Sequence, residues 1–168
     1  RLRLDASTQS AKCATFQRLH DWLRSLPSEH DIRREISALC AEPLIEIGAH
    51  TVSHCSLAKQ TEEMARSEIT ESRARIEAEL QRPVLHMAYP YGDRAAAGPR
   101  EFVLAAASGY KTAVTTRPGM IFPESADHLT ALSRVSLNGH YQDPRVLPVL
   151  TSGAATAMWN GFRRIDAA

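Results

Sequence analysis

The sequence predicts an α/β fold in which helices cover a parallel sheet, and within this class it favours part of an α/β barrel over an open sheet. From residue 43 onwards, short apolar runs alternate with segments of helical periodicity. Such alternation is typical of β-α-β units, whose strands are buried on both faces. The apolar runs end at glycine or at turn-forming residues, as expected where parallel strands lead into loops.

Two helices are expected before the first strand. Residues 8–26 place apolar side chains at spacings of three and four, which is typical of a helix with one buried face, and Pro27 follows. A second helix is expected over residues 28–40, with Ser28 as its N-cap. We expect residues 1–40 to form a hairpin-like helical pair added to the sheet domain.

Residues 43–48 form a short apolar run that stops at Gly48, so they are predicted to be a buried strand. The join between the helix ending at Cys40 and this strand is unusually short, which leaves two alternatives: residues are missing between Cys40 and Ala41, or nothing was omitted there. After a loop, the next helix is predicted to begin at the N-cap Thr61 and to end before Pro83. Two ion pairs of i,i+4 spacing are expected on it: Glu62 with Arg66, and Glu71 with Arg75.

The same alternation continues towards the C-terminus. A strand is predicted over 84–89, a helix from Pro99 to Gly109, a strand over 110–116, a turn at 117–119 and a last strand over 132–137. We therefore assign residues 41–145 to the α/β domain. Residues 146–168 are expected to form a covering tail with a short helix from Ala154 to Trp159.

The charge balance limits the partners. The chain has 20 basic and 19 acidic residues and a net charge of +1, which argues against a nucleic-acid or anionic-membrane surface. No apolar run approaches the roughly 20 residues that cross a bilayer. The three cysteines lack a metal-binding or disulfide spacing, so reduced thiols are expected. These features favour a soluble, cytoplasmic protein with a small or neutral partner over a periplasmic or secreted one.

His50 and His54 are the candidate metal ligands. They are four residues apart, directly after the predicted strand 43–48, and neither fits a hydrophobic pattern. Two imidazoles at this spacing can bind one cation if the segment is helical or tightly turned, and Zn²⁺ favours such ligands. The alternative is that both histidines simply occupy a polar loop. The position favours a metal site, because the loops after the strands of an α/β barrel hold its active site.

A second candidate segment, residues 89–93, ends the next predicted strand. Its order Tyr89-Pro90-Tyr91-Gly92-Asp93 is that of a rigid turn, because proline fixes the backbone before Tyr91. Such a turn can present a backbone N–H to an oxyanion. The alternative is an ordinary turn with two half-buried tyrosines.

Together, the two segments resemble the polysaccharide deacetylase family, also called the NodB-homology group or carbohydrate esterase family 4. His50-Thr51-Val52-Ser53-His54 is similar to the family's metal motif, and Ala88-Tyr89-Pro90-Tyr91-Gly92 is similar to its arginine-x-proline-tyrosine segment. The resemblance covers about residues 43–137.

The resemblance implies a distorted (β/α) barrel that removes acetyl groups from N-acetylated carbohydrates. It implies Zn²⁺ or another divalent ion such as Co²⁺, Ni²⁺ or Mn²⁺, bound by two histidines and an aspartate. His50 and His54 would be the histidine ligands, and the Tyr91 N–H would stabilise the oxyanion. Pro90 and Gly92 would contact the substrate.

Three features depart from the family pattern. The chain has no Asp-Asp pair, which in the family supplies the catalytic base and the third ligand. Ala88 replaces the arginine of the second segment, and Leu132-Ser133-Arg134 stands where the general acid is expected. We therefore expect that the fold is incomplete at its N-terminus and that an N-terminal segment or fragment of the same protein completes the site. The alternatives are a non-catalytic carbohydrate-binding protein on the same scaffold and a helical interaction module attached to an inert domain.

Overall fold

The computed structural model describes residues 45–136 and 143–163. The chain divides into two compact units, 1–46 and 47–168, and the description below concerns the second. The helices expected over 8–26 and 28–40, and the join at Cys40, lie outside the described residues.

Helix α3 (Glu62–Leu80) has the predicted bounds. Thr61 begins it by accepting a hydrogen bond from the Met64 N–H on its side-chain oxygen, and a left-handed Gln81 ends it. Both expected ion pairs are present, with N–O distances of 2.7 Å for Glu62–Arg66 and 3.0 Å for Glu71–Arg75. Because these side chains are exposed and screened by solvent, the two pairs add little to the stability of the fold. The apolar face, with Ala65 and Ile69 fully buried, is what fixes the helix to the core.

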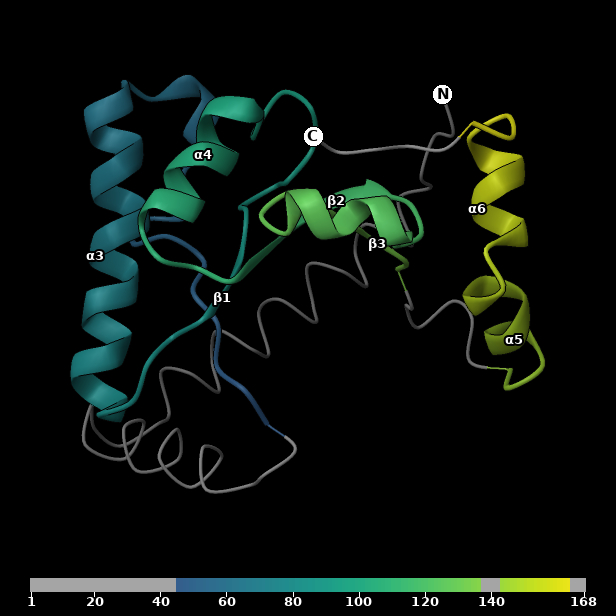
Figure 1. The fold of residues 1–168 in the computed structure, drawn as a ribbon, viewed down its shortest axis with the longest axis horizontal. Helices are drawn as coiled ribbons and strands as arrows, with labels where there is room; N and C mark the ends of the chain where they lie inside the picture. Colours follow the sequence, from purple (N-terminus) through teal and green to yellow (C-terminus); the bar gives the residue numbers. More distant parts are fainter. Residues whose placement is uncertain (1–44, 137–142, 164–168) are drawn as a thin grey trace, which may run out of the picture. The chain divides into compact units, whose positions relative to one another are not determined.

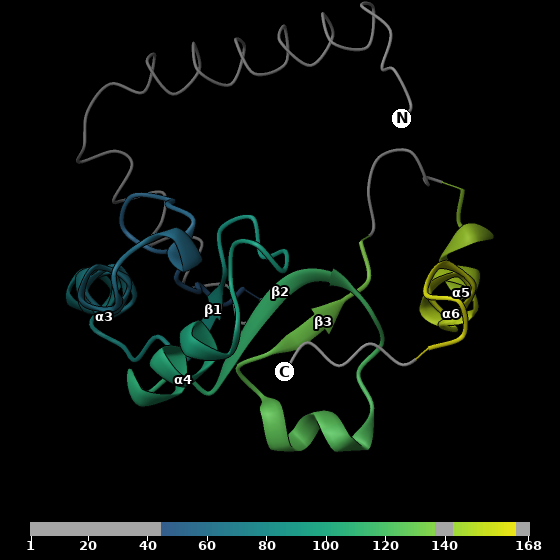
Figure 2. The ribbon, with the colours of Figure 1, turned by 90° about the horizontal axis from the view of Figure 1, so that it is seen from above.

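Three parallel strands form one sheet in the order β1-β2-β3 (Figures 1 and 2). Their bounds are β1 His86–Ala88, β2 Thr112–Pro118 and β3 Leu132–Arg134. The first pair is in register from His86 opposite Thr112, and the second from Val114 opposite Leu132. Parallel strands with helical connections confirm the predicted α/β class. The described residues show this sheet and not a closed barrel.

The strand predicted over residues 43–48 is not formed in its described part, 45–48. Only Ala49 pairs with the sheet, through a parallel bridge to Met87. Its N–H donates to the His86 carbonyl at 2.9 Å, and its carbonyl accepts from the Ala88 N–H at 2.9 Å. Gly48 runs so close to the sheet that an added Cβ would lie 3.0 Å from the His86 carbonyl oxygen. The chain therefore reaches the sheet edge at the residue before His50.

Helix α4 (Pro99–Ala107) follows β1 and lies beside α3, as both views show (Figures 1 and 2). The Glu101 carboxylate accepts the Gly98 N–H at 2.7 Å and so caps the first turn. The helix ends where Gly109 takes a φ of +82°, as expected from the sequence. Arg100 of this helix donates to the carbonyls of Leu57 and Gln60 at 2.9 and 3.0 Å, which fixes the short 3₁₀ helix η1 (Leu57–Lys59) against α4.

The core lies between the sheet and these helices. Tyr89, Leu57, Ile69 and Val84 have the largest fully buried apolar side chains. The Tyr89 ring packs against Phe102 with 5.4 Å between ring centroids, and its hydroxyl donates to the Thr130 carbonyl at 2.7 Å. Residues from α3, α4, η1 and the sheet therefore share one core, which holds the loops between them in fixed positions.

The prediction of a turn at 117–119 is wrong, because β2 continues to Pro118. Arg117 continues the inward alternation of Ala113 and Thr115 and is buried. Its guanidinium lies 5.3 Å from the centre of the Phe102 ring and donates to the Ala97 carbonyl. Because Arg117 is buried in this way, the chain continues as a strand through Arg117 and Pro118 instead of turning there. The 3₁₀ helix η2 (Pro123–His128), not anticipated from the sequence, connects β2 to β3.

Two short helices follow, α5 (Val146–Thr151) and α6 (Ala154–Trp159). The predicted helix over 154–159 is thus present, and Asn160 after it donates to the Pro118 carbonyl at 3.1 Å. Neither helix contains a buried residue, and Trp159 and Phe162 are 80% and 82% exposed. No helix among the described residues has the length and apolar character needed to span a membrane.

Candidate functional site

The first part of the site is the His loop, which we define as residues 50–54. It begins immediately after the Ala49 bridge, so the sheet edge fixes the position of His50. The His50 Nδ1 lies 2.7 Å from the Ala88 carbonyl oxygen. Because a carbonyl only accepts, this nitrogen carries the proton, and the lone pair of a neutral ring is then on Nε2. Metal-binding histidines are commonly oriented by such a bond through their other nitrogen.

The His loop is a tight turn rather than a helix. Thr51 and His54 both have left-handed backbones, with φ of 62° and 57°. The Thr51 hydroxyl oxygen accepts the His54 N–H at 3.1 Å and closes the turn. As a result the two imidazole rings face each other edge to face, with 4.8 Å between their centroids and 64° between their planes. The structure therefore brings together the two histidines that the sequence predicts as ligands.

Glu68 of α3 holds the His loop. One of its carboxylate oxygens accepts the backbone N–H groups of Val52 and Ser53 at 2.8 and 2.9 Å, and the other accepts the Ser53 hydroxyl at 2.7 Å. Partial burial raises the pKa of this carboxyl, and the bonds from Ser53 and Val52 outweigh that effect, so the pKa lies below its ordinary value of 4.5. Glu68 is thus a carboxylate at neutral pH.

The second part is the Tyr loop, residues 90–92. The Gly92 N–H donates to the Pro90 carbonyl at 2.7 Å, and Tyr91 between them has a φ of 61°. Thr116 at the end of β2 fixes this turn: its N–H donates to the Gly92 carbonyl at 3.0 Å, and its hydroxyl donates to the Tyr91 carbonyl. Within the described residues, the Tyr91 N–H has no acceptor. A fixed turn with an unused N–H is the arrangement that an oxyanion donor needs.

The two loops meet through Tyr91. Its ring contacts the His54 ring edge to face with 5.1 Å between centroids, and it is 60% exposed. The other tyrosine of the segment has a different role. Burial and the nearby Glu101 raise the pKa of the Tyr89 hydroxyl far above its ordinary value, with Arg117 opposing them, so Tyr89 stays neutral inside the core. The site-facing tyrosine is Tyr91.

The His pair has the chemistry of a divalent-metal site, but it is only part of one. Two imidazoles lie side by side, and the outward nitrogen of His50 is oriented by the Ala88 carbonyl. Across residues 45–136 and 143–163, no set of three or more His, Cys, Asp or Glu side chains forms a metal-binding group. In the segment where the general acid is expected, Leu132 and Ser133 are buried in β3 and Arg134 is exposed. Among the described residues, the two histidines are thus a pair of candidate ligands without a third His, Cys, Asp or Glu beside them.

Sequence reasoning missed Glu68 and Thr116, although both act on residues that it identified. Glu68 lies 15 residues beyond Ser53 and on a helix that already carries many charged side chains. Thr116 lies 25 residues beyond Tyr91. The available signal is positional: Glu68 is three residues after the buried Ala65 and four before the buried Ser72, so it lies on the packed face of the helix.

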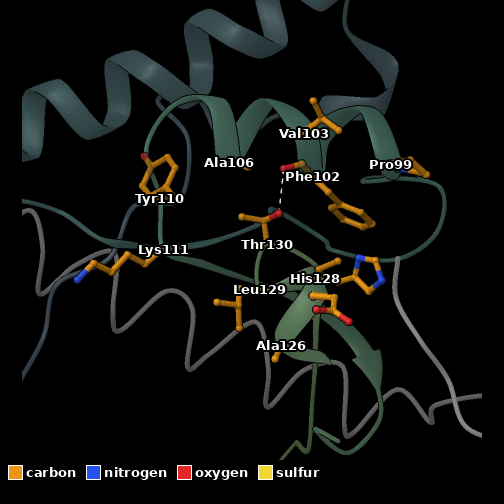
Figure 3. A pocket seen from close by; sticks show the side chains of 12 residues that line it. Pro99, Phe102, Val103, Ala106, Tyr110, Lys111, Ala126, His128, Leu129 and Thr130 are labelled. Carbon is orange, nitrogen blue, oxygen red and sulfur yellow. Dashed lines mark hydrogen bonds between the residues drawn. The ribbon is translucent and has the colours of Figure 1, made fainter. Parts of the chain in front are cut away.

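A separate cavity of about 460 Å³ lies between α4 and η2 (Figure 3). Phe102, Val103, Leu129 and Thr130 are among the side chains around it, and the Thr130 hydroxyl donates to the Phe102 carbonyl at 3.0 Å. None of His50, His54 and Tyr91 lines it. This cavity is therefore separate from the site formed by the two loops.

The family model described as polysaccharide deacetylase matches residues 13–112, which is more than half of the chain. The chain belongs to the polysaccharide deacetylase family. The match includes both the His loop and the Tyr loop, and it begins earlier than the stretch 43–137 on which the sequence resemblance rests. No curated protein matches the chain.

Solved deacetylases share the fold. The Streptococcus pyogenes deacetylase PplD, solved in complex with acetate, has a TM-score of 0.55 and 19% identity over 68% of this chain and 55% of its own. BC0361, a polysaccharide deacetylase from Bacillus cereus, has a TM-score of 0.53 and 25% identity over 61% of this chain and 31% of its own. The chain thus spans about half of the first structure and a third of the second.

Proposed function

We propose that this deacetylase-family protein is a metal-dependent hydrolase that removes N-acetyl groups from a carbohydrate, a polysaccharide or chitooligosaccharide. The observation that carries the proposal is the contact between the His pair and the Tyr loop. It places two imidazoles beside a fixed turn with an unused N–H, in a chain of the polysaccharide deacetylase family.

Each residue has a role in the proposed reaction. His50 and His54 would hold Zn²⁺ or a similar divalent ion such as Co²⁺, Ni²⁺ or Mn²⁺ through their ring nitrogens. Such an ion, when bound, polarises the acetyl carbonyl and makes water acidic enough to act as a nucleophile near neutral pH. The Tyr91 N–H would stabilise the negative charge that develops on the carbonyl oxygen. Pro90 and Gly92 are both buried, so in place of the substrate contact expected from the sequence they would shape the turn that presents this N–H.

The base and the third ligand are proposed to come from outside these 168 residues. The sequence contains no Asp-Asp pair, and the described residues add no third metal ligand. The chain also spans only 55% and 31% of the two solved structures it resembles. We therefore infer that an N-terminal segment of the same protein completes both the site and a distorted (β/α) barrel, of which the three-stranded sheet is one part.

A second candidate is a carbohydrate-binding protein without catalytic activity. The observation that favours it is Ala88, a methyl group at the position where the resemblance predicts an arginine, together with the absence of an Asp-Asp pair. In this case the His pair would hold a structural ion and the sugar would bind without being cleaved.

Metal removal distinguishes the two candidates. We expect acetate release from tri-N-acetylchitotriose by the longest natural polypeptide containing this chain to disappear after chelation and to return with Zn²⁺ or Co²⁺. The 168-residue chain, assayed in parallel, is expected to bind the ion and the sugar with little acetate release, because it lacks the base. Sugar binding without metal-dependent acetate release by the longer polypeptide would instead support the binding protein.

The Glu68→Ala variant is expected to bind Zn²⁺ about 10- to 100-fold more weakly than the unmodified chain, as is typical when a group that orients metal ligands is lost. The reason is that three hydrogen bonds from the His loop end on this carboxylate. Isothermal titration with Zn²⁺ measures the effect. Since the folded-state pKa of Glu68 is lowered, the ordering of the loop by the charged carboxylate is present above pH 4.5 and is lost as the pH falls through the folded-state value.

Two further variants show whether a loss of Zn²⁺ affinity comes from the lost positioning of the His loop or only from the lost negative charge on α3. Glu68→Gln keeps an oxygen for the two backbone N–H groups and is expected to recover most of the affinity. Glu71→Ala, on the same helix but bonded to Ser67 and Arg75, is the matched control and should bind Zn²⁺ normally. Equal losses in Glu68→Ala and Glu71→Ala would show that Glu68 does not position the ligands.

A further inference from the structure

Strained backbone conformations gather in the two loops of the site. Among the described residues, five that are not glycine have a positive φ, and three of these lie in the His loop and the Tyr loop: Thr51, His54 and Tyr91. A left-handed backbone is unfavourable for a residue with a Cβ, so it persists only where the surrounding structure holds it. Each loop therefore needs contacts that keep it in this form.

The Tyr loop is a three-residue turn with the strained residue at its centre. The Gly92 N–H donates to the Pro90 carbonyl at 2.7 Å, and Tyr91 between them has a φ of 61°. A turn of this size with a positive φ at its centre is the rare and strained form of the γ-turn. Its own hydrogen bond uses the Pro90 carbonyl, so the next two carbonyls, of Tyr91 and Gly92, are open to partners elsewhere in the chain.

Thr116, near the end of β2, bonds to both of these carbonyls. Its N–H donates to the Gly92 carbonyl at 3.0 Å, and its hydroxyl donates to the Tyr91 carbonyl. The first bond comes from the backbone and does not depend on the side chain. The second depends on the hydroxyl alone, and it fixes the peptide group that directly follows the Tyr91 Cα. The Thr116 side chain thus restrains the backbone of Tyr91, whose own N–H has no acceptor among the described residues.

The Thr116 side chain is exposed, whereas its neighbours Thr115 and Arg117 are buried. Its hydroxyl is therefore not part of the packed core. β2 lies between β1 and β3 in the sheet, so the strand that carries this hydroxyl is itself held on both sides. Removal of the hydroxyl should consequently affect the Tyr loop and leave the sheet intact.

We propose that Thr116 is a positioning residue for the oxyanion donor. Its hydroxyl holds Tyr91 in the left-handed conformation and so keeps the Tyr91 N–H in place for the oxygen that becomes negative during the reaction. This role rests on the proposed function, because it requires the Tyr91 N–H to be the oxyanion donor. It gives a part in the reaction to a strand residue outside both loops.

The kinetic test uses the longest natural polypeptide containing this chain, loaded with Zn²⁺, and tri-N-acetylchitotriose as substrate. Thr116→Val removes the hydroxyl but keeps the backbone N–H and the shape of the side chain. We expect kcat to fall roughly 10- to 100-fold while KM stays within about twofold, because a misplaced oxyanion donor affects the transition state and not the bound substrate. Thr116→Ser, which keeps the hydroxyl, should recover most of kcat.

A second measurement does not depend on activity. In the same polypeptide labelled with ¹⁵N-tyrosine, the nuclear magnetic resonance signal of the Tyr91 amide reports the conformation and motion of the turn. This signal should shift or broaden in Thr116→Val and keep its position in Thr116→Ser. Thr112→Val is the matched control, because Thr112 lies at the other end of β2 and its hydroxyl oxygen lies 2.7 Å from the His86 Nδ1. Its kcat, its KM and its Tyr91 signal should equal those of the unmodified protein.

Three kinetic results would overturn the role of Thr116: an unchanged kcat in Thr116→Val, an equal loss in Thr116→Ser, or a change in KM alone. Failure of the proposed function gives a different result, because the unmodified polypeptide would then release no acetate with Zn²⁺ present. In that case the Tyr91 signal decides. A change in Thr116→Val but not in Thr116→Ser would support the link between this hydroxyl and the turn, and an unchanged signal would overturn that link as well.

Discussion

His50→Ala and His54→Ala are each expected to weaken the binding of Zn²⁺ by at least about 100-fold, which exceeds the loss typical of groups that only orient metal ligands. The two rings face each other at 4.8 Å, so removing either leaves one imidazole among the described side chains near the site. Equilibrium dialysis with Zn²⁺ measures the affinity. The visible absorption of bound Co²⁺ shows whether nitrogen ligands are lost.

His128→Ala is the matched control, because His128 is also exposed but lines the separate cavity between α4 and η2. It should bind both ions as the unmodified chain does. If all three variants bound Zn²⁺ equally well, the His pair would not be a metal site, and the hydrolytic function proposed for it would lose its support.

The largest loss of stability is expected for Gly92→Ala in the Tyr loop. Gly92 has a φ of +63°, and an added Cβ would lie 2.6 Å from the Thr116 backbone nitrogen. Backbone strain and this contact act together, so the free energy of unfolding should fall by roughly 2 to 4 kcal/mol. The contact cannot be relieved by a side-chain rotation, because the opposing atom belongs to β2. Urea denaturation measures the change.

Gly161→Ala distinguishes the effect of backbone strain from the effect of the close contact with β2. Gly161 has a φ of +59°, and an added Cβ there would have no neighbour within 4 Å. Its substitution carries only the left-handed strain, about 1 kcal/mol. Equal destabilisation by the two variants would mean that the close approach of Gly92 to β2 has no energetic effect.

Local signals in the sequence located most of the secondary structure. Thr61 begins α3 because its hydroxyl oxygen accepts a nearby backbone N–H, and the helix ends at a left-handed Gln81, before Pro83, as the sequence predicts. The prediction failed where a distant contact decides the outcome. Arg117 continues β2 because Phe102 and the Ala97 carbonyl receive its guanidinium, and neither is near it in sequence. Residues 45–48 look apolar enough for a strand, yet only Ala49 reaches β1.

The two histidines of the candidate site could be predicted from the sequence, whereas the residues that hold their loop in place could not. His50 and His54 stand out because they are paired at short range after an apolar run. The Ala88 carbonyl, 38 residues away, orients the His50 ring, and Glu68 holds Val52 and Ser53 between the two histidines from 16 and 15 residues away. Such facts depend on packing, which a single sequence does not show.

The supports of the two loops differ in origin. Glu68 holds the His loop from the helix that follows it, so the loop and its support lie within residues 50–68. Thr116 holds the Tyr loop from the strand that follows it, within residues 90–116. Each loop and the side chain that holds it therefore lie within one uninterrupted stretch of chain. Exchange of residues 50–68 with a relative would transfer both histidines together with Glu68, while the Ala88 carbonyl and the Tyr91 ring that contact them would come from the recipient chain.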